Sequence, residues 1–112
     1  MKNYLLFYTD LMPDRFSGFT IGFVILLRPK VREDVAMLEH EKVHVAQFWR
    51  SLGTFGILYK LSKKYRLKYE LEAYTKQLEF CENKDYAKRI FAGHLSNKYN
   101  LDITYEDALK LF

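Results

Sequence analysis

The segment His40-Glu41-Lys42-Val43-His44 has the residue types and spacing that best suit chemistry in this chain. In a helix, side chains four residues apart lie one turn apart on the same face, so both imidazoles could bind one metal ion. Imidazole is a common ligand of Zn²⁺. Glu41 would lie about 100° around the helix from His40, where its carboxylate could reach a metal-bound water without binding the metal. The pattern predicts His40 and His44 as zinc ligands and Glu41 as the catalytic acid/base.

A catalytic zinc site usually has three protein ligands and a water, so another element must supply the third ligand. A later helix is expected to carry Glu70, Glu72 and Glu79. At 100° per residue, Glu70 lies among the apolar residues of that helix, whereas Glu72 and Glu79 lie on the solvent side. An inward carboxylate is costly unless it is paired or binds a metal. Glu70 is therefore the predicted third ligand.

Gln47 lies three residues after His44 on the same helix face, and it could hydrogen-bond a ligand or the partner of a ligand. The alternative interpretation of the whole pattern is an ordinary amphipathic helix with two incidental histidines. That interpretation leaves Glu70 without a reason to face inward.

The elements that position these residues are predicted from apolar periodicity and from capping residues. Glu33 and Asp34 are acidic residues suited to a helix start, and apolar residues then recur at helical spacing. Gly53 and Gly56 are expected to break this first helix. The predicted helices span residues 34–51, about 57–82, about 85–98, and a short stretch from Thr104 to the C-terminus.

The N-terminal part is expected to be a small antiparallel sheet. Residues 5–9 suit one strand, and residues 16–28 suit one strand or two short strands hinged near Gly22, because they are rich in aromatic and β-branched side chains. Strands come first along the chain and helices follow. This order predicts an α+β fold, mostly α, in a single domain over residues 1–112.

The composition limits the classes of protein to consider. The chain has 112 residues, 49% of them hydrophobic and 17% aromatic, with a formal net charge of +4. Such a length excludes a large multidomain enzyme. The single cysteine, Cys81, excludes an internal disulfide framework and a cysteine-rich zinc finger, and it is expected to be a small buried residue. We therefore expect a cytoplasmic protein in a reducing compartment.

The motif HEKVH, followed 26 residues after His44 by Glu70-Leu71-Glu72-Ala73, resembles the gluzincin zinc metallopeptidases. The longer strings LEHEKVHVAQFWR and YRLKYELEAYTKQ are similar to very small bacterial and phage proteins, sometimes called minimal gluzincins. The resemblance covers about residues 34–80. It implies a zinc site of His40, His44 and Glu70, with Glu41 as the acid/base. It also implies that an extended peptide substrate binds along an edge strand between Gly18 and Leu27.

Two features depart from the family pattern. Lys42 occupies a usually uncharged position, about 200° from His40, where it can point to solvent. Larger members have a separate domain that closes the cleft and supplies an electrophilic His, Tyr or Arg, for which a chain of 112 residues leaves no room. Tyr69, Tyr74 and His94 are candidate substitutes. For His94 we favour a place at the edge of the core, since histidine is intermediate in burial.

A basic cluster interleaves with apolar residues in the second predicted helix: Lys60, Lys63, Lys64, Arg66 and Lys68. We expect a solvated helix face, with contact to an anionic membrane as the alternative and nucleic acid disfavoured. The connector of residues 48–61 is rich in apolar side chains. It is expected to pack against the sheet, with a protein partner or a membrane surface as the alternative.

Three functions are consistent with these features. In a zinc peptidase, the ion would polarise the scissile carbonyl and activate water, and Glu41 would carry the proton to the leaving amine. A non-catalytic, zinc-stabilised binding protein would need His40, His44 and Glu70 but not Glu41. A basic binding module without metal leaves Glu70 unexplained. The sequence therefore favours the peptidase.

Overall fold

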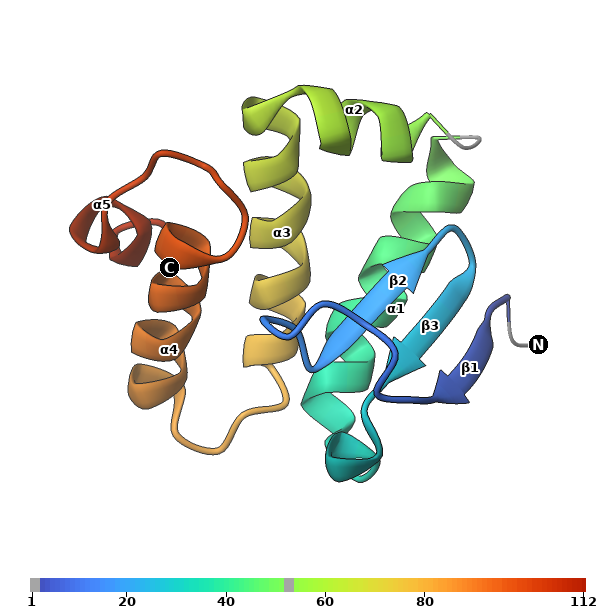
Figure 1. Cartoon of the computed structure of the whole chain (residues 1–112). Helices are drawn as coiled ribbons and strands as arrows, with labels where there is room; N and C mark the ends of the chain where they lie inside the picture. Colours follow the sequence, from blue (N-terminus) through green and yellow to red (C-terminus); the bar gives the residue numbers. More distant parts are fainter. Residues whose placement is uncertain (1–2, 52–53) are drawn as a thin grey trace.

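The computed structural model describes residues 3–51 and 54–112 as a mostly helical α+β fold, as predicted (Figure 1). A small sheet comes first along the chain and the helices follow. The strands are β1 (Leu5–Tyr8), β2 (Gly18–Ile21) and β3 (Val24–Leu27), and a short 3₁₀ turn, η1 (Pro29–Val31), follows them. The helices are α1 (Val35–Arg50), α2 (Phe55–Leu61), α3 (Lys63–Leu78), α4 (Lys84–Asn97) and α5 (Tyr105–Leu109).

The three strands form a sheet in the order β1-β3-β2, so that β2 is an edge strand. β2 and β3 are an antiparallel hairpin, with Gly18 opposite Leu27. Gly22 lies in the turn between them with a φ of +61°, a conformation that other residues rarely adopt. The predicted hinge near Gly22 is confirmed.

The expectation of a fully antiparallel sheet is wrong for β1, which runs parallel to β3. Residues 9–17 carry the chain from β1 past the position of β3 to the far edge of the sheet, so that β2 runs back and β3 then lies between them, parallel to β1 (Figure 1). Arg28 fixes this connection, because its guanidinium donates hydrogen bonds to four backbone carbonyl oxygens, those of Asp10, Met12, Pro13 and Phe16.

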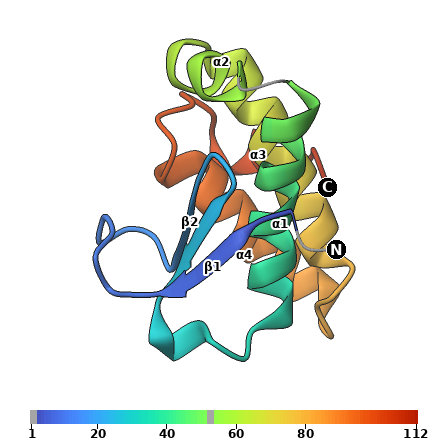
Figure 2. The same cartoon turned by 90° about the vertical axis from the view of Figure 1, so that its right-hand side faces the viewer.

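Helix α1 packs against one face of the sheet (Figure 2). Asp34 caps its N-terminus, since the Asp34 carboxylate accepts a hydrogen bond from the backbone N–H of Met37 at 2.9 Å. Ile25, Leu27 and Val45 are fully buried between the helix and the sheet. The helix agrees with the predicted span of 34–51. Gly53, one of the two predicted breakers, lies outside the described residues, and Gly56 lies inside α2.

The single helix predicted over 57–82 is wrong, because the chain turns at Ser62 and forms two helices, α2 and α3. Ser62 has an extended backbone, and its hydroxyl accepts a hydrogen bond from the N–H of Tyr65 at 3.3 Å, which caps α3. Arg66 donates to the carbonyl oxygens of Tyr59 and Lys60, at 2.8 Å each, at the end of α2. These bonds hold α2 across the end of α3 (Figure 1).

The larger apolar core lies where α3, α4 and α5 meet, and α4 and α5 begin close to the predicted residues. Thr104 caps α5 as expected, but the helix ends at Leu109 and does not reach the C-terminus. Cys81 packs partly buried against this core. The buried members are Tyr74, Ala87, Phe91, Ala92, Leu95, Tyr99, Leu101 and Ala108.

Across the described residues, the helices fall short of the length and apolarity that crossing a bilayer requires.

Candidate metal centre

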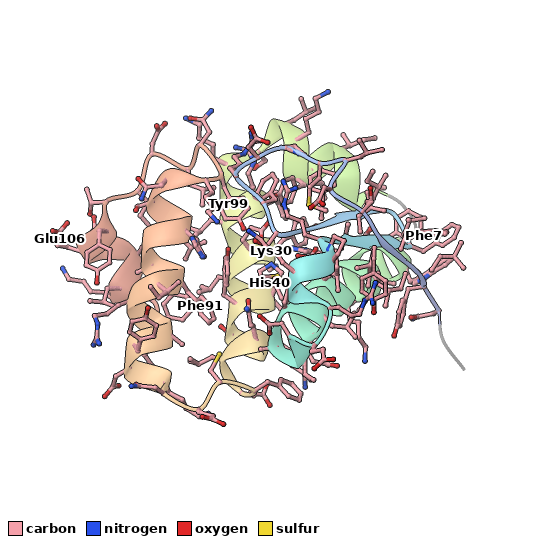
Figure 3. All side chains as sticks on the ribbon, turned by 60° about the horizontal axis from the view of Figure 1, so that its bottom comes forward. Phe7, Lys30, His40, Phe91, Tyr99 and Glu106 are labelled. Carbon is pink, nitrogen blue, oxygen red and sulfur yellow. The ribbon has the colours of Figure 1, made fainter. Side chains whose placement is uncertain are left out.

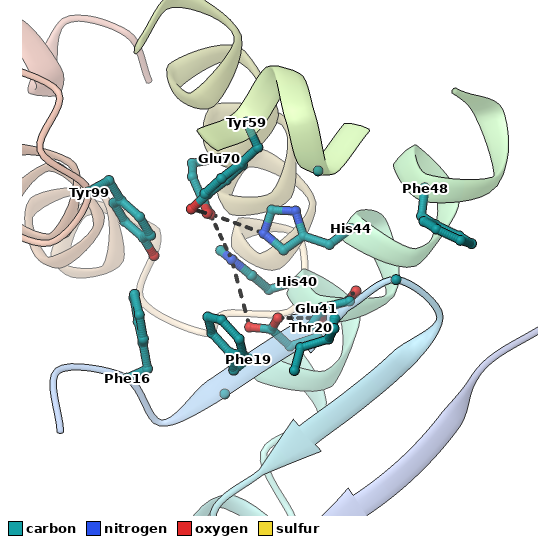
Figure 4. Close-up of a pocket in the computed structure, with 14 residues that line it drawn as sticks. Phe16, Phe19, Thr20, His40, Glu41, His44, Phe48, Tyr59, Glu70 and Tyr99 are labelled. Atoms are coloured by element: carbon teal, nitrogen blue, oxygen red, sulfur yellow. Dashed lines mark hydrogen bonds and ion pairs between the residues drawn. The ribbon is translucent and has the colours of Figure 1, made fainter. Parts of the chain in front are cut away.

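The three predicted ligands meet between α1 and α3 (Figure 4). Oε1 of Glu70 lies 3.2 Å from Nε2 of His40 and 3.1 Å from Nε2 of His44. The side chains are buried, since His40, His44 and Glu70 are only 4%, 6% and 3% exposed. One ligand atom from each residue lies within 4.8 Å of the other two. The structure thus brings together two imidazole nitrogens and one carboxylate oxygen in a buried cluster.

Helix geometry explains why Glu70 reaches this cluster and the neighbouring acids do not. Glu72 and Glu79 are exposed, as the 100° periodicity predicted. The two histidines lie one turn apart on the face of α1 that packs against α3, with ring centroids 5.1 Å apart. The ring centroid of Tyr74, on α3, lies 4.3 Å from that of His40, so the Tyr74 ring packs against the imidazole.

Two glutamine side chains orient the histidines. Nδ1 of His40 lies 2.9 Å from Oε1 of Gln77, and Nδ1 of His44 lies 2.8 Å from Oε1 of Gln47. An amide oxygen can only accept, so each Nδ1 carries the hydrogen, and each Nε2 faces Glu70. The sequence pointed to Gln47. It did not point to Gln77, although Gln77 lies two turns after Glu70 on the same face.

Gln47 is itself held in place. Its Nε2 donates to the carbonyl oxygen of Tyr69 at 3.1 Å and to Oε1 of Glu72 at 2.5 Å. Arg50 donates to the same Glu72 oxygen at 2.9 Å. A continuous chain of hydrogen bonds therefore fixes the His44 ring from the outer surface of α3.

The cluster balances its charge internally. Burial lowers the pKa of His44, but the Glu70 carboxylate and its hydrogen bond raise that pKa more strongly, to about 9. Burial likewise raises the pKa of Glu70, but the two histidines lower it well below its usual range. Glu70 is therefore ionised, and a protonated His44 can compensate its charge. A divalent cation bound here would displace that proton.

Glu41 is buried beside the cluster, with Oε2 3.9 Å from Nε2 of His40. The hydroxyl of Thr20 on strand β2 donates to Oε1 of Glu41 at 2.7 Å. A Cβ atom at Gly18 would lie 2.9 Å from Leu27 and 3.1 Å from the Glu41 carboxylate, so a larger residue would require both side chains to shift. The sequence did not identify Thr20 or Gly18, because their approach to Glu41 depends on how the sheet packs against α1.

Tyr59 of α2 donates a hydrogen bond to Oε2 of Glu70 at 2.5 Å. This bond occupies one carboxylate oxygen and leaves Oε1 facing the histidines. Burial and the negative charge of Glu70 raise the pKa of the Tyr59 phenol well above its usual range, so the hydroxyl remains a donor. No sequence pattern indicated Tyr59, which the turn at Ser62 brings to the site.

The cluster forms the floor of a pocket of about 430 Å³ (Figure 4). Strand β2 runs along one side, and the walls are largely aromatic: Phe16, Phe19, Phe48, Tyr59 and Tyr99.

The electrophiles proposed from the sequence, Tyr69, Tyr74 and His94, are not among the described residues that line this pocket. The Tyr74 hydroxyl hydrogen-bonds that of Tyr99 at 2.6 Å, below the His40 ring. His94 lies half-buried beside Tyr74, at the core edge that the sequence favoured. The pocket-lining phenols are Tyr59 and Tyr99.

No known protein family, curated protein or solved structure matches this chain.

Proposed function

We propose that this protein is a zinc-dependent peptidase, of the gluzincin type that the sequence resembles. One observation carries the proposal: two imidazole nitrogens and a carboxylate oxygen converge in a buried cluster, and a further carboxylate, Glu41, lies beside it without being needed to bind the ion. A structural zinc site would not require Glu41. A peptidase requires a base at this place.

The donor set fits Zn²⁺, which binds histidine nitrogen and carboxylate oxygen in tetrahedral sites. Bonds of about 2.0–2.1 Å place tetrahedral ligand atoms about 3.3 Å apart. The distances from Oε1 of Glu70 to the two Nε2 atoms, 3.2 and 3.1 Å, are close to that value. His40, His44 and Glu70 would therefore hold the ion with small side-chain movements.

Bound zinc supplies Lewis acidity, which polarises a scissile carbonyl and lowers the pKa of water. Glu41 takes the proton of the attacking water and delivers it to the leaving amine. Because Thr20 occupies Oε1 of Glu41, the proton acceptor is Oε2, the oxygen nearer His40. Tyr59 keeps Glu70 oriented by donating its single O–H hydrogen to Oε2, and its neutral ring forms part of the pocket wall.

The substrate we propose is an extended peptide or protein segment that pairs with β2. This strand is at the edge of the sheet and borders the pocket, so its outer backbone groups can add a further strand. The aromatic walls suit apolar side chains of the substrate. We place the reaction in the cytoplasm, because a single unpaired cysteine fits a reducing compartment.

Elemental analysis of protein purified without a histidine tag tests the metal, and one zinc per chain is expected. Incubation with a mixed pool of unfolded peptides tests the activity through newly formed amino termini. Glu41→Gln should retain zinc and fold and abolish cleavage, because the amide cannot accept the proton. Glu39→Gln is the matched control on the same helix and should cleave like the unaltered protein. Equal cleavage by the Glu41→Gln protein would contradict the assignment of Glu41.

A zinc-stabilised binding protein is the second candidate. The observation in its favour is that the cluster joins α1 to α3 through ligands that are at most 6% exposed, which suits a structural ion. This candidate predicts bound zinc and a higher melting temperature with zinc, with no cleavage by the unaltered protein. The peptide pool therefore separates the two functions.

A further inference from the structure

Helix α2 exposes apolar side chains on its outer face. Ile57 is 63% exposed and Leu61 is 78% exposed. They lie one turn apart, and the exposed Lys60 lies on the same face. The opposite face of the helix borders the pocket through Gly56 and Tyr59.

The apolar connector of residues 48–61 was expected to pack against the sheet. Phe48 and Trp49 do contact Phe23 in the β2–β3 hairpin, whereas the outer face of α2 is exposed to solvent at the end of the molecule (Figure 1).

The charge of the chain segment that includes this helix is strongly one-sided. Between Glu41 and Glu70 the sequence has no acidic residue and seven basic ones. Four of the seven are engaged within the fold. Arg66 donates to backbone carbonyls, and the other three form ion pairs: Lys42 with Glu39, Arg50 with Glu72, and Lys63 with Asp102. The other basic residues of the corner are exposed and form no ion pair with any described residue: Lys60, Lys64 and Lys68.

We propose that the α2–α3 corner, formed by Ile57, Lys60, Leu61, Lys64 and Lys68, binds an anionic membrane surface. Aliphatic side chains surrounded by lysines suit the boundary between lipid headgroups and acyl chains: the aliphatic groups enter the interface and the ammonium groups meet the anionic headgroups. Nucleic acid would use the lysines but gain nothing from an exposed isoleucine and leucine, because its single strands bind by stacking on aromatic rings.

Docking at this corner has a consequence for the pocket. Because Gly56 and Tyr59 of α2 line the pocket, docking through the outer face of this helix would hold the pocket within one helix diameter, ~10 Å, of the bilayer. If the proposed peptidase activity is present, its substrates would then be polypeptide segments at the membrane surface. The membrane proposal itself does not depend on zinc or on catalysis.

Sedimentation with lipid vesicles tests the proposal. We expect binding to vesicles of phosphatidylcholine with one quarter phosphatidylglycerol, weakening as salt is added, and no binding to pure phosphatidylcholine. Each lysine-to-alanine change at Lys60 or Lys64 should lower the partition coefficient roughly fivefold, the equivalent of about 1 kcal/mol per basic residue. Leu61→Ser should lower it by roughly tenfold or more, because the buried aliphatic area is lost.

Two exposed positions away from the corner provide matched controls. Leu11→Ser removes an exposed leucine from the loop after β1, and Lys30→Ala removes an exposed lysine from η1. Both should bind vesicles like the unaltered protein, and melting curves verify that all variants are folded. The proposal is overturned if the unaltered protein stays in the supernatant with anionic vesicles at low salt, or if corner and control variants lose binding equally. Binding to a DNA oligonucleotide that the lysine changes weaken and Leu61→Ser does not, without vesicle binding, would also overturn it.

Discussion

Helix α3 meets α1 through polar groups and α4 through apolar ones. Figure 3 shows His40 on the α1 side of α3 and Phe91 on its α4 side. Toward α1, Glu70 and Gln77 contact the two histidines. Toward α4, the partners are side chains such as Phe91 and Leu95, packed without a charged group. Buried charges need a compensating partner, whereas packed apolar groups need only their neighbours. The contact with α1 should therefore respond to metal ions and strongly to protons, whereas the contact with α4 should respond only weakly to protons and not to metal ions.

The largest expected effect is on the apolar side. Phe91→Ala should lower the free energy of unfolding by about 3–5 kcal/mol, because it leaves a cavity among α3, α4 and α5. Denaturant titrations should give the same loss of unfolding free energy for Phe91→Ala whether zinc or a chelator is present. Tyr86→Ala, an exposed aromatic on the same helix, is the control and should cost little. If the loss of unfolding free energy in Phe91→Ala depended on zinc, the α4 contact would not be independent of the metal as we expect.

Glu70→Gln should cost about 3 kcal/mol on the polar side, because it leaves the buried histidines without their compensating charge. It should also abolish the stabilisation by zinc. Glu79→Gln, on the exposed face of the same helix, should change neither quantity, since exposed ion pairs contribute little. Thermal melts of both variants with and without zinc provide the measurement, and a zinc-induced shift that survives in Glu70→Gln would exclude Glu70 as a ligand.

Zinc and pH should act together on the polar side. Free zinc at 100 times its dissociation constant should add about 2.7 kcal/mol to stability, and His44→Ala should behave like the chelated protein. With chelator present, the pKa of His44 is about 9 in the folded protein and about 6.5 in the unfolded chain, so the folded protein keeps the proton to a higher pH. The stabilisation from that proton is complete below pH 6.5 and is lost as the pH rises through 9.

Zinc binding should correspondingly strengthen as the pH rises toward 9, because the competing proton leaves His44. Melting temperatures measured over this range, with zinc and with chelator, give both trends. A zinc affinity independent of pH between 6.5 and 9 would contradict the assignment of His44 as a ligand.

The smallest effect concerns His94, a titratable group on the apolar side. Burial and the charge of Lys98 lower the pKa of His94 to about 4, below its usual value of 6.5. As the pH falls, His94 takes up a proton in the unfolded chain at a higher pH than in the folded protein. Stability is therefore lost as the pH falls from 6.5 toward 4. After allowance for partial exposure, the loss from pH 7 to pH 5 should be about 1 kcal/mol. His94→Gln should remove this slope, and a slope unchanged in the variant would assign it to other groups.

Local periodicity was sufficient to place Glu70, because the direction of a side chain within one helix follows from 3.6 residues per turn. The same reasoning could have found Gln77. It could not find Thr20 or Tyr59, since these reach the site through strand and helix contacts that no short sequence window encodes. The break at Ser62 was hidden by the good helix formers around it, where one serine hydroxyl and one arginine decide the turn. The connection after β1 is likewise held by a distant residue, Arg28.

The glutamine partners of the two histidines affect the electronic character of any ion held there. A carboxylate partner would draw the Nδ1 proton and enrich the imidazole in electron density, whereas the neutral amides of Gln47 and Gln77 do so less. An ion bound to these rings would keep more of its electron-accepting power. The amides do not titrate, so each Nδ1 keeps its hydrogen and each ring keeps its orientation while Nε2 of His44 gains or loses a proton.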